Sequence, residues 1–355
     1  MKKVLMKGNE AMAFAAIKGG CDAYFGYPIT PQNEVSEYLS KYLKLDGKVF
    51  LQAESEVAAI NMVYGAASTG KHVMTSSSSP GIALKQEGIS YLCGAELPCL
   101  IINVMRGGPG LGGIQPSQSD YNQITRGGGN GDYHLLAYAP ENLQETVDII
   151  KASFSIADYY RNPVMIAIDG LIGQMMEPVD LEKEVKLKNE KNKDWIASGK
   201  KGGKRNVITS LYLDPAVLEQ HNLKLNKKYQ EMIQTEQRWE MINIKNAEFV
   251  IIAYGTMSRI CRSSIKMLKE KGINVGILRP ITIWPFPELA FKELPSTVKG
   301  LMSCELSLGQ MIDDVKIANN GKYPVSFFGR VGGMIPEPEE IVEAIIKFKK
   351  EVSHE

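Results

Sequence analysis

Metal-binding residues are scarce in this sequence, which contains 5 cysteines and 4 histidines among 355 residues. The cysteines are odd in number, and no two of them have the C-x-x-C spacing of zinc or iron–sulfur sites. Because free cysteine behaves as a small apolar residue, we expect buried thiols at Cys21, Cys93, Cys99, Cys261 and Cys304. The histidines form no ligand pattern either. The sequence therefore predicts no metal site on this chain.

Excess charge of one sign and long hydrophobic runs are also missing. The 41 basic and 40 acidic residues create no field that would attract nucleic acid or an anionic membrane. No stretch approaches the roughly 20 apolar residues that span a bilayer. Lys7 interrupts the N-terminal apolar residues before they reach signal-peptide length. We therefore expect a soluble, cytoplasmic chain that binds neither nucleic acid nor membrane.

The sequence does contain two regions in which strand and helix patterns alternate. Residues 1–180 predict an α/β domain with a doubly wound, mostly parallel sheet. Residues 246–355 predict a second, smaller α/β domain, since a chain of 355 residues exceeds the size of most single cores. Residues 181–245 predict a polar connection and then an amphipathic helix over 216–239. Its lysine-rich part, 182–205, is expected to face water, with a basic binding patch as the alternative.

Polar residues follow several predicted strands of the first region. Thr30 and Pro31 come after a strand at 23–27, with Pro31 expected as the first helical residue and Thr30 as its cap. Glu56 opens a helix after a strand at 49–51, and Arg106 ends the apolar strand 100–105. Because parallel strands end at one edge of a sheet, we expect Thr30, Glu56 and Arg106 to line one crevice.

Each of these residues also has an ordinary structural explanation. A glutamate at a helix start interacts favourably with the helix dipole, threonine is a common cap, and arginine commonly forms salt bridges. The convergence of all three with glycine-rich loops favours a binding site instead. In such a site Thr30 and Arg106 would bind a carboxylate, and Glu56 would hydrogen-bond a heteroaromatic nitrogen.

As a set, these motifs resemble the α subunit of the thiamine-diphosphate-dependent 2-oxoacid:ferredoxin oxidoreductases. The resemblance runs from Gly8 to Pro336 and rests on Tyr27-Pro28-Ile29-Thr30-Pro31, Ser55-Glu56, Arg106 and Ala253-Tyr254-Gly255-Thr256. It implies that the first region is a pyrimidine-binding domain for thiamine diphosphate. It also implies that the last region is a transketolase C-terminal-like domain.

The resemblance further implies roles for individual residues. Glu56 would be catalytic, because its carboxyl group would face the pyrimidine N1′ atom and favour the imino tautomer, which takes the thiazolium C2 proton. Thr30 and Arg106 would contact the carboxylate of the 2-oxoacid. The remaining contacts to the cofactor would come from Tyr27, Pro28, Ile29, Ser79 and Pro80.

The chain lacks the other half of such a site. Family members hold Mg²⁺ and the diphosphate with a Gly-Asp-Gly motif followed by an asparagine, whereas Asp46-Gly47 and Asp169-Gly170 lack the preceding glycine. The resemblance thus implies a β subunit with the Mg²⁺–diphosphate site, a γ subunit, and a δ subunit that bears the iron–sulfur clusters. Ferredoxin and coenzyme A would be further partners. On its own, this chain is expected to be inactive.

The loop 108–120 resembles the branched-chain, 2-oxoisovalerate type more than the 2-oxoglutarate type. It offers no cation before Arg126 for a second substrate carboxylate. The expected reaction is oxidative decarboxylation of the 2-oxoacid to acyl-CoA and CO₂, with electrons passed to ferredoxin, and 2-oxoglutarate is the alternative substrate. Two readings are more distant. The first is a nicotinamide-binding dehydrogenase, because Gly108, Gly110 and Gly113 have the G-x-G-x-x-G spacing of that class. The second is a non-catalytic scaffold.

Overall fold

The first domain contains a seven-stranded sheet in the order β12-β6-β7-β5-β4-β2-β3. The computed structural model describes residues 3–45, 47–199 and 205–353, so Asp46 lies outside the described residues. Neighbouring strands from β6 to β3 are parallel, and only the edge strand β12 is antiparallel. The strands are β2 (Ala23–Gly26), β3 (Val49–Gln52), β4 (Val73–Ser77), β5 (Leu100–Met105), β6 (Leu136–Tyr138), β7 (Val164–Asp169) and β12 (Thr282–Trp284).

Helices connect these strands and cover the sheet, which confirms the predicted doubly wound domain. Helix α1 packs against α2 and α6, while α3 packs against α4. The central strand β5 is buried along its whole length, as its apolar sequence predicts. The helices are α1 (Gly8–Lys18), α2 (Asn33–Leu45), α3 (Glu56–Ala67), α4 (Ser79–Gly94), α5 (Tyr121–Thr125), α6 (Leu143–Tyr160) and α7 (Gly170–Gln174). Strands β1 (Val4–Lys7) and β8 (Met176–Val179) pair separately as a small antiparallel ribbon.

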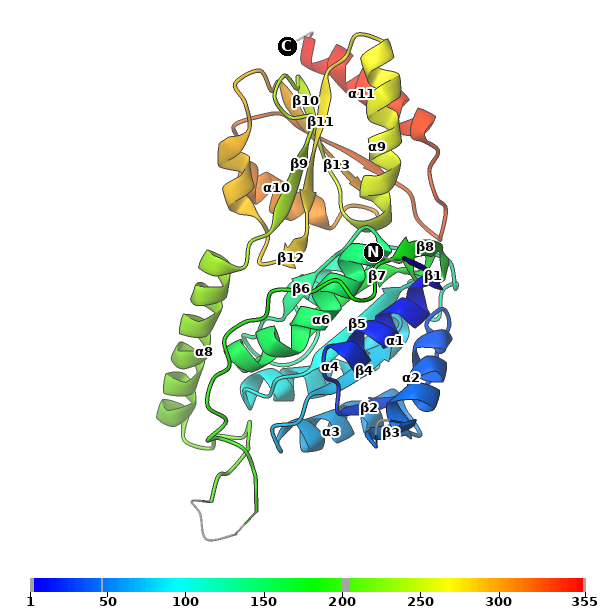
Figure 1. The fold of residues 1–355 in the computed structure, drawn as a ribbon. Coiled ribbons are helices and arrows are strands. Elements are labelled where there is room, and N and C mark those ends of the chain that lie inside the picture. Colours follow the sequence, from blue (N-terminus) through cyan, green and yellow to red (C-terminus); the bar gives the residue numbers. More distant parts are fainter. Residues whose placement is uncertain (1–2, 46, 200–204, 354–355) are drawn as a thin grey trace.

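The second, smaller α/β domain lies above the first in Figure 1. Its five-stranded sheet has the order β14-β13-β10-β11-β9 and is parallel except for β9. The strands are β9 (Trp239–Ile242), β10 (Phe249–Ile252), β11 (Val275–Pro280), β13 (Gly300–Glu305) and β14 (Val325–Gly329). The helices are α9 (Gly255–Glu270), the 3₁₀ helix η1 (Glu288–Glu293), α10 (Met311–Asn319) and α11 (Pro338–Ser353).

The two domains exchange edge strands. Strand β12 belongs to the C-terminal part of the sequence but pairs with β6 of the first sheet. Strand β9 lies within the expected connection 181–245 but pairs with β11 of the second sheet. Figure 1 shows β12 between the domains and helix α8 (Pro215–Thr235) beside the first domain. A division at a single residue therefore does not separate the two sheets.

Two local predictions were wrong. Helix α2 begins at Asn33, so Pro31 is not its first residue and Thr30 is not its cap. Instead, the main-chain N–H of Gln32 donates to the Ile29 carbonyl, which closes a turn before the helix starts. The helix predicted over 216–239 ends at Thr235, because Trp239 pairs with β11 as the first residue of β9.

The lysine-rich connection follows the first domain rather than only facing water. Lys188 lies 2.5 Å from Glu236, and Lys193 lies 2.7 Å from Asp158 of α6. These ion pairs use the chain's own carboxylates. Residues 200–204 of this segment lie outside the described residues.

The predicted thiols are confirmed, since all 5 cysteines are free and buried. Burial raises the pKa of Cys21 and of Cys93 to about 12, so both stay uncharged and unreactive at neutral pH. None of the described helices is both long and apolar enough to cross a membrane.

A buried arginine joins the two domains. Arg279 of β11 is 3% exposed, and its guanidinium donates two hydrogen bonds of 2.8 Å to Glu145 of α6. Its Nε atom donates to Glu240 of β9 at 2.9 Å. Close by, Thr256 of α9 donates to Asp169 of the first domain at 2.8 Å. The relative position of the domains is therefore fixed by buried polar contacts.

We expect Arg279→Met to lower the free energy of unfolding by about 3–5 kcal/mol, because it removes a buried cation and leaves Glu145, whose side chain is 18% exposed, without its ion pair. The control is Lys299→Met, which removes the ion pair with Glu248 of a lysine whose side chain is 57% exposed, and should cost about 1 kcal/mol or less. Chemical denaturation of the full chain measures both. Equal losses in the two variants would contradict this account of the interface.

Candidate functional site

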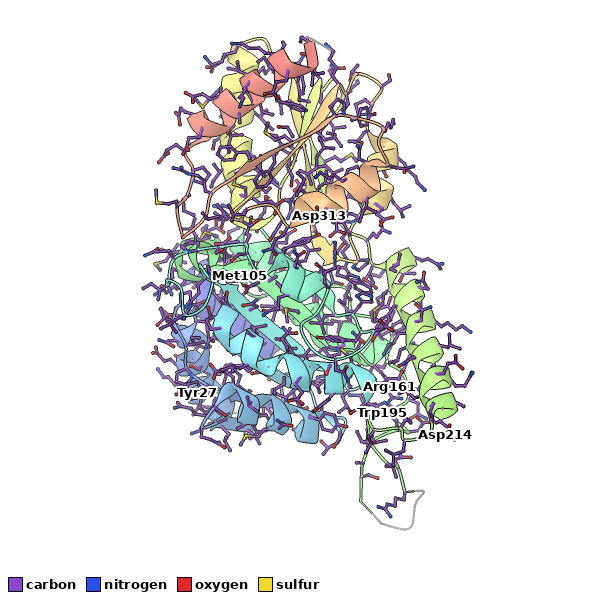
Figure 2. All side chains as sticks on the ribbon, turned by 180° about the vertical axis from the view of Figure 1, so that it is seen from behind. Tyr27, Met105, Arg161, Trp195, Asp214 and Asp313 are labelled. Atoms are coloured by element: carbon purple, nitrogen blue, oxygen red, sulfur yellow. The ribbon has the colours of Figure 1, made fainter. Side chains whose placement is uncertain are left out.

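Four neighbouring strands deliver the predicted residues to one edge of the first sheet. In the order β5-β4-β2-β3, Arg106 follows β5, Ser79 follows β4, Thr30 follows β2 and Glu56 follows β3. Strand β2 lies at the switch point, because β3 is paired on one side of it and β4 on the other. Open α/β sheets bind ligands at this position. Figure 2 shows Met105, the last residue of β5, and Tyr27, which follows β2, along the same side of the domain.

Arg106 lies at the centre of this edge and is 6% exposed. Its guanidinium donates to the main-chain oxygens of Thr30 at 2.9 Å and of Leu111 at 3.0 Å. The predicted proximity of Thr30 and Arg106 is therefore confirmed, through the Thr30 carbonyl. The Nε atom of Arg106 is buried without a hydrogen-bond partner among the described residues.

Glu56 lies at the first turn of α3, where the side chain of Ser55 caps the helix. The Glu56 side chain is 6% exposed and reaches the N-terminal turn of α4. A Cβ atom added to Gly81 would come within 2.7 Å of Glu56 Oε1 and within 2.1 Å of Ser77 Oγ. Only glycine at this position leaves room for the carboxylate beside α4.

The same N-terminal turn of α4 contacts Arg106. Ser79 Oγ accepts from the Arg106 main-chain N–H at 3.0 Å and donates to Asp120 at 2.7 Å. Ser79 thus lies beside Arg106, and Gly81, two residues later, lies beside Glu56. The structure therefore places Glu56 and the main chain of Arg106 at the start of one helix, and the Thr30 carbonyl at the Arg106 guanidinium.

Five of the 15 buried side-chain polar atoms without hydrogen-bond partners among the described residues lie at this edge. Within the described residues they include Gln32 Nε2, Ser77 Oγ, Ser78 Oγ, Asn103 Oδ1 and Arg106 Nε. Leaving a buried polar group unpaired costs about 1–3 kcal/mol, so native structures rarely collect several in one place. Five such atoms at one edge of the sheet, with Ser77 Oγ beside Gly81 and the Glu56 carboxylate, indicate that a polar ligand completes the site.

Sequence reasoning missed two charged residues of this region. Asp120 accepts hydrogen bonds from Ser79 and Asn103, and burial raises the pKa of its carboxyl group. Lys85 of α4 is fully buried, and this burial lowers its pKa from 10.5 to about 7. The sequence did contain a sign that Lys85 is buried. Lys85 has the helical spacing of the apolar residues Ile82, Ile89 and Leu92, which form the buried face of α4.

Two hollows open near this edge of the sheet, and neither Glu56 nor Arg106 lines either of them. One, of about 430 Å³, is lined by Thr30 and Pro31 and by the loop residues Ile114 and Gln115. The other, of about 540 Å³, is lined by Ser79, Pro80 and Asp120, the loop 108–110 and residues of the second domain. The predicted residues Thr30, Ser79 and Pro80 therefore face open space. Tyr27, Pro28 and Ile29 precede Thr30 in the segment that links β2 to α2.

The loop after Arg106 does not have the form of a dinucleotide-binding turn. It folds back on itself, because the main-chain N–H of Gly107 donates to Gln115 and that of Gly113 donates to Gly107. The first helix after the loop, α5, begins only at Tyr121. The spacing of Gly108, Gly110 and Gly113 thus lacks the helix N-terminus that binds a pyrophosphate.

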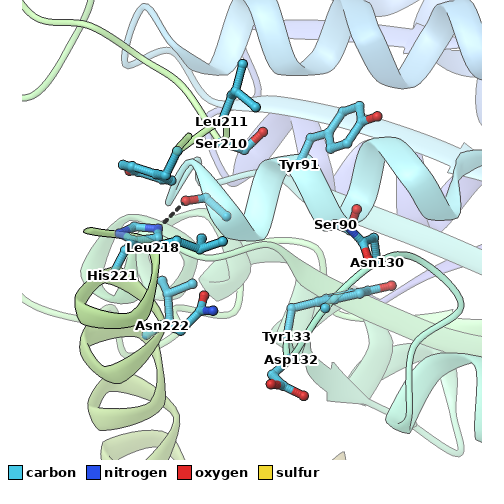
Figure 3. A pocket seen from close by; sticks show the side chains of 14 residues that line it. Ser90, Tyr91, Asn130, Asp132, Tyr133, Ser210, Leu211, Leu218, His221 and Asn222 are labelled. Atoms are coloured by element: carbon cyan, nitrogen blue, oxygen red, sulfur yellow. Dashed lines mark hydrogen bonds between the residues drawn. The ribbon is translucent and has the colours of Figure 1, made fainter. Parts of the chain in front are cut away.

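A separate cavity of about 400 Å³ lies between the end of α4, the loop 130–133 and α8 (Figure 3). His221 Nε2 lies 2.6 Å from the Gly94 carbonyl oxygen, and the ring of Tyr212 lies against the His221 ring. The residues that line this cavity come from α4, the loop 130–133, the segment 210–212 and α8, and none of them directly follows β5, β4, β2 or β3. The chemistry of the site therefore rests on the edge of the first sheet.

Sequence families match both parts of the chain. The family described as pyruvate flavodoxin/ferredoxin oxidoreductase, thiamine diphosphate-binding, matches residues 14–243, and pyruvate:ferredoxin oxidoreductase core domain II matches residues 247–341. The ketoisovalerate oxidoreductase subunit VorB of Methanothermobacter thermautotrophicus is 46% identical, over 97% of each chain. The 2-oxoglutarate synthase subunit KorA of the same organism is 33% identical, over 98% of this chain and 100% of its own.

Solved structures agree with this assignment. A 2-oxoglutarate:ferredoxin oxidoreductase from Magnetococcus marinus, with 2-oxoglutarate, coenzyme A and succinyl-CoA bound, matches with a TM-score of 0.89 and 26% identity. That match covers 99% of this chain, which spans 65% of the length of the other. A split-gene transketolase shares the fold, with a TM-score of 0.58 at 14% identity. The chain therefore belongs to the pyruvate flavodoxin/ferredoxin oxidoreductase family, as a subunit that carries its thiamine diphosphate-binding domain.

Proposed function

We propose that this chain is the pyrimidine-binding half of the active site of a 2-oxoacid:ferredoxin oxidoreductase that acts on a branched-chain 2-oxoacid. The reaction is oxidative decarboxylation to acyl-CoA and CO₂, with a pair of electrons passed to ferredoxin. The observation that carries the proposal is the position of Glu56 and Arg106 around one helix start, among buried polar atoms that lack partners.

The residues present fit thiamine diphosphate. Its aminopyrimidine ring needs one carboxyl group at N1′ and polar neighbours for its amino group, and this edge offers Glu56 together with the free oxygens of Ser77 and Asn103. The segment 27–29 and the start of α4 would supply the walls of the ring site. When bound, the cofactor supplies the electron sink for the loss of CO₂.

The chain's own residues bind, orient and exchange a proton. Glu56 accepts or donates the proton at the pyrimidine N1′, from a position fixed by the α3 cap and by Gly81. Arg106 supplies positive charge for the substrate carboxylate, with its unpartnered Nε as a free donor. Thr30, which is exposed and carries a hydroxyl group, lies beside Arg106. Binding and proton transfer are thus assigned to different residues.

Apolar side chains on the loop favour a branched-chain substrate. Leu111 is 80% exposed and Ile114 is 56% exposed, and the Leu111 carbonyl accepts from Arg106. No lysine, arginine or histidine occurs between Arg106 and Arg126. Arg126 itself is 2.8 Å from Asp314 and thus already paired. A second substrate carboxylate, as in 2-oxoglutarate, would find no free cation on this loop.

Partner subunits supply what the chain lacks. We assign Mg²⁺ and the diphosphate to a β subunit and the iron–sulfur clusters to a δ subunit, with a γ subunit as a further partner, because all 5 cysteines of this chain are buried and free. No cluster of His, Cys, Asp or Glu that would hold a metal occurs in the part of the chain that the structure describes. Coenzyme A is bound in the related Magnetococcus marinus enzyme, and we propose it as acyl acceptor here.

The proposal is tested by purifying the chain with its native partners and measuring 2-oxoacid-dependent reduction of a viologen dye. We expect kcat/KM for 2-oxoisovalerate to exceed that for 2-oxoglutarate at least about 10-fold, because the second carboxylate of 2-oxoglutarate would be buried without a partner. Such burial costs more than the ~1.4 kcal/mol that a tenfold difference represents. A preference for 2-oxoglutarate would contradict the substrate assignment. A chain that is always purified alone, without thiamine diphosphate, would contradict the function itself.

Glu56 and Arg106 should affect different kinetic constants. We expect Glu56→Gln to lower kcat about 10²–10⁴-fold, because the proton at N1′ can no longer be exchanged. Arg106→Met should chiefly raise KM, by roughly 10- to 100-fold, since it removes a charge-assisted hydrogen bond of ~1.5–3 kcal/mol. Arg126→Met is the control, because that guanidinium is paired with Asp314. Steady-state kinetics of the complex measure all three, and near-normal turnover of Glu56→Gln is the result that would refute its role.

Gly81→Ala should test whether Glu56 contacts the cofactor, by comparison with a glycine substitution outside the site. Its Cβ atom would displace the Ser77 hydroxyl and the carboxylate of Glu56, so we expect at least about a tenfold loss of cofactor affinity, as for one lost charge-assisted hydrogen bond. Gly65→Ala in α3 is the matched control, because its Cβ atom meets nothing within 4 Å and should stabilise the helix by roughly 0.5–1 kcal/mol. Titration of the complex with thiamine diphosphate, followed by fluorescence, measures the difference. Equal affinity in both variants would show that Glu56 does not contact the cofactor.

A further inference from the structure

Asp120 is a buried acidic residue to which the proposed reaction assigns no role. It immediately precedes α5 and is 8% exposed. One carboxylate oxygen, Oδ2, accepts from Ser79 Oγ at 2.7 Å and from Asn103 Nδ2 at 2.9 Å. Ser79 lies at the start of α4 and Asn103 lies on β5, so Asp120 joins two of the elements that carry the site.

The hydroxyl group of Ser79 has two acceptors within reach. One is Asp120 Oδ2, and the other is the Arg106 carbonyl oxygen at 3.2 Å. Because the bond to Asp120 is the shorter of the two, the hydroxyl hydrogen points toward Asp120. The Ser79 oxygen then accepts from the Arg106 main-chain N–H at 3.0 Å. Asp120 therefore sets the direction in which Ser79 holds the main chain of Arg106.

Arg106 depends on this support because the strand before it, β5, ends at Met105. Its guanidinium donates to the main-chain oxygens of Thr30 and Leu111, which both lie in turns. The bond to Ser79 is the contact that ties the main chain of Arg106 to a helix. A shift of this main chain would move the guanidinium relative to both of its acceptors.

The second domain holds Asp120 in place. Gln310, which precedes α10, donates to the Ser119 carbonyl oxygen at 2.7 Å and accepts from the Asn122 main-chain N–H at 2.7 Å. One of these contacts comes before Asp120 in the sequence and the other comes after it. The main chain of Asp120 is thus anchored on both sides, so its carboxylate has a fixed position relative to Ser79.

We propose that Asp120 is a positioning residue for Arg106 and acts through the hydroxyl group of Ser79. The carboxylate orients Ser79, Ser79 holds the main chain of Arg106, and the guanidinium is thereby placed for the substrate carboxylate. This inference rests on the proposed function, in which Arg106 binds the carboxylate of the 2-oxoacid. The role depends on hydrogen bonds rather than on charge, because a single oxygen accepts both bonds and an amide oxygen can replace it.

The first test measures the main-chain hydrogen bond itself, by amide hydrogen exchange of the whole complex followed by mass spectrometry. In Asp120→Leu we expect the Arg106 amide to exchange at least about 10-fold faster, because its acceptor is no longer oriented. The control is Asp180→Leu. Asp180 is also 8% exposed, but it follows β8 and accepts from the Glu182 main-chain N–H. Equal exchange of the Arg106 amide in the native and Asp120→Leu complexes would overturn the proposal.

The second test is the steady-state kinetics of the same complexes. Asp120→Leu should raise KM for 2-oxoisovalerate roughly 3- to 10-fold, as for one lost hydrogen bond, and leave kcat within about twofold. Asp120→Asn should recover most of this loss, since its amide oxygen can accept from both Ser79 and Asn103. Asp180→Leu should leave KM unchanged. Equal losses in Asp120→Asn and Asp120→Leu would refute the proposal, because they would attribute the effect to the charge of Asp120.

A double variant shows whether the effect passes through Arg106. In the Arg106→Met complex, Asp120→Leu should cause no further rise in KM, because the side chain that it positions is gone. Independent, additive increases would contradict the proposal. If Asp120→Leu does not assemble, Ser79→Ala replaces it in each comparison, since it removes the same link. A native complex without 2-oxoacid-dependent dye reduction would instead refute the proposed function, whereas the exchange of the Arg106 amide would still test the link to Asp120.

Discussion

Parallel register is the constraint on which the site depends. Strands β5, β4, β2 and β3 run in the same direction side by side, so the residues that follow them arrive at the same edge. Arg106 and Glu56 are far apart in the sequence, yet both contact the first turn of α4. Arg106 and Glu56 do not need to contact each other to be placed correctly, because the hydrogen bonds between the strands of the sheet fix the distance between the strand ends.

Burial gives this edge its chemical character. Glu56, Arg106, Asp120 and Lys85 are each less than a tenth exposed, and charges in such surroundings interact more strongly than in water. Each charge therefore needs a neighbour or a ligand. The hydrogen bonds of Ser79 and the carbonyl groups around Arg106 satisfy part of this need, while several polar atoms stay without a partner. A site of this kind is prepared for a ligand that is itself polar.

The second domain supports the site without contributing its central charges. Gln118 bridges the domains by donating to the Tyr254 carbonyl and accepting from the Leu306 main-chain N–H. Because this residue lies in the chain between Arg106 and α5, the loop beside the site is anchored to the second domain. The exchange of β9 and β12 strengthens the same connection. Movement of the second domain would therefore disturb the loop that follows Arg106.

The sequence by itself determined the alternation of strands and helices, the two α/β domains and the placement of Thr30, Glu56 and Arg106 after neighbouring strands at one edge of the first sheet, because these follow from local patterns and from the direction of parallel strands. It also predicted the buried thiols. Only the tertiary structure decided where α2 and α8 begin and end, which edge strands are exchanged, and that Lys85 is buried near Glu56. Turn hydrogen bonds, strand pairing between distant segments and the desolvation of a lysine depend on neighbours in space, and the order of residues along a chain does not specify them.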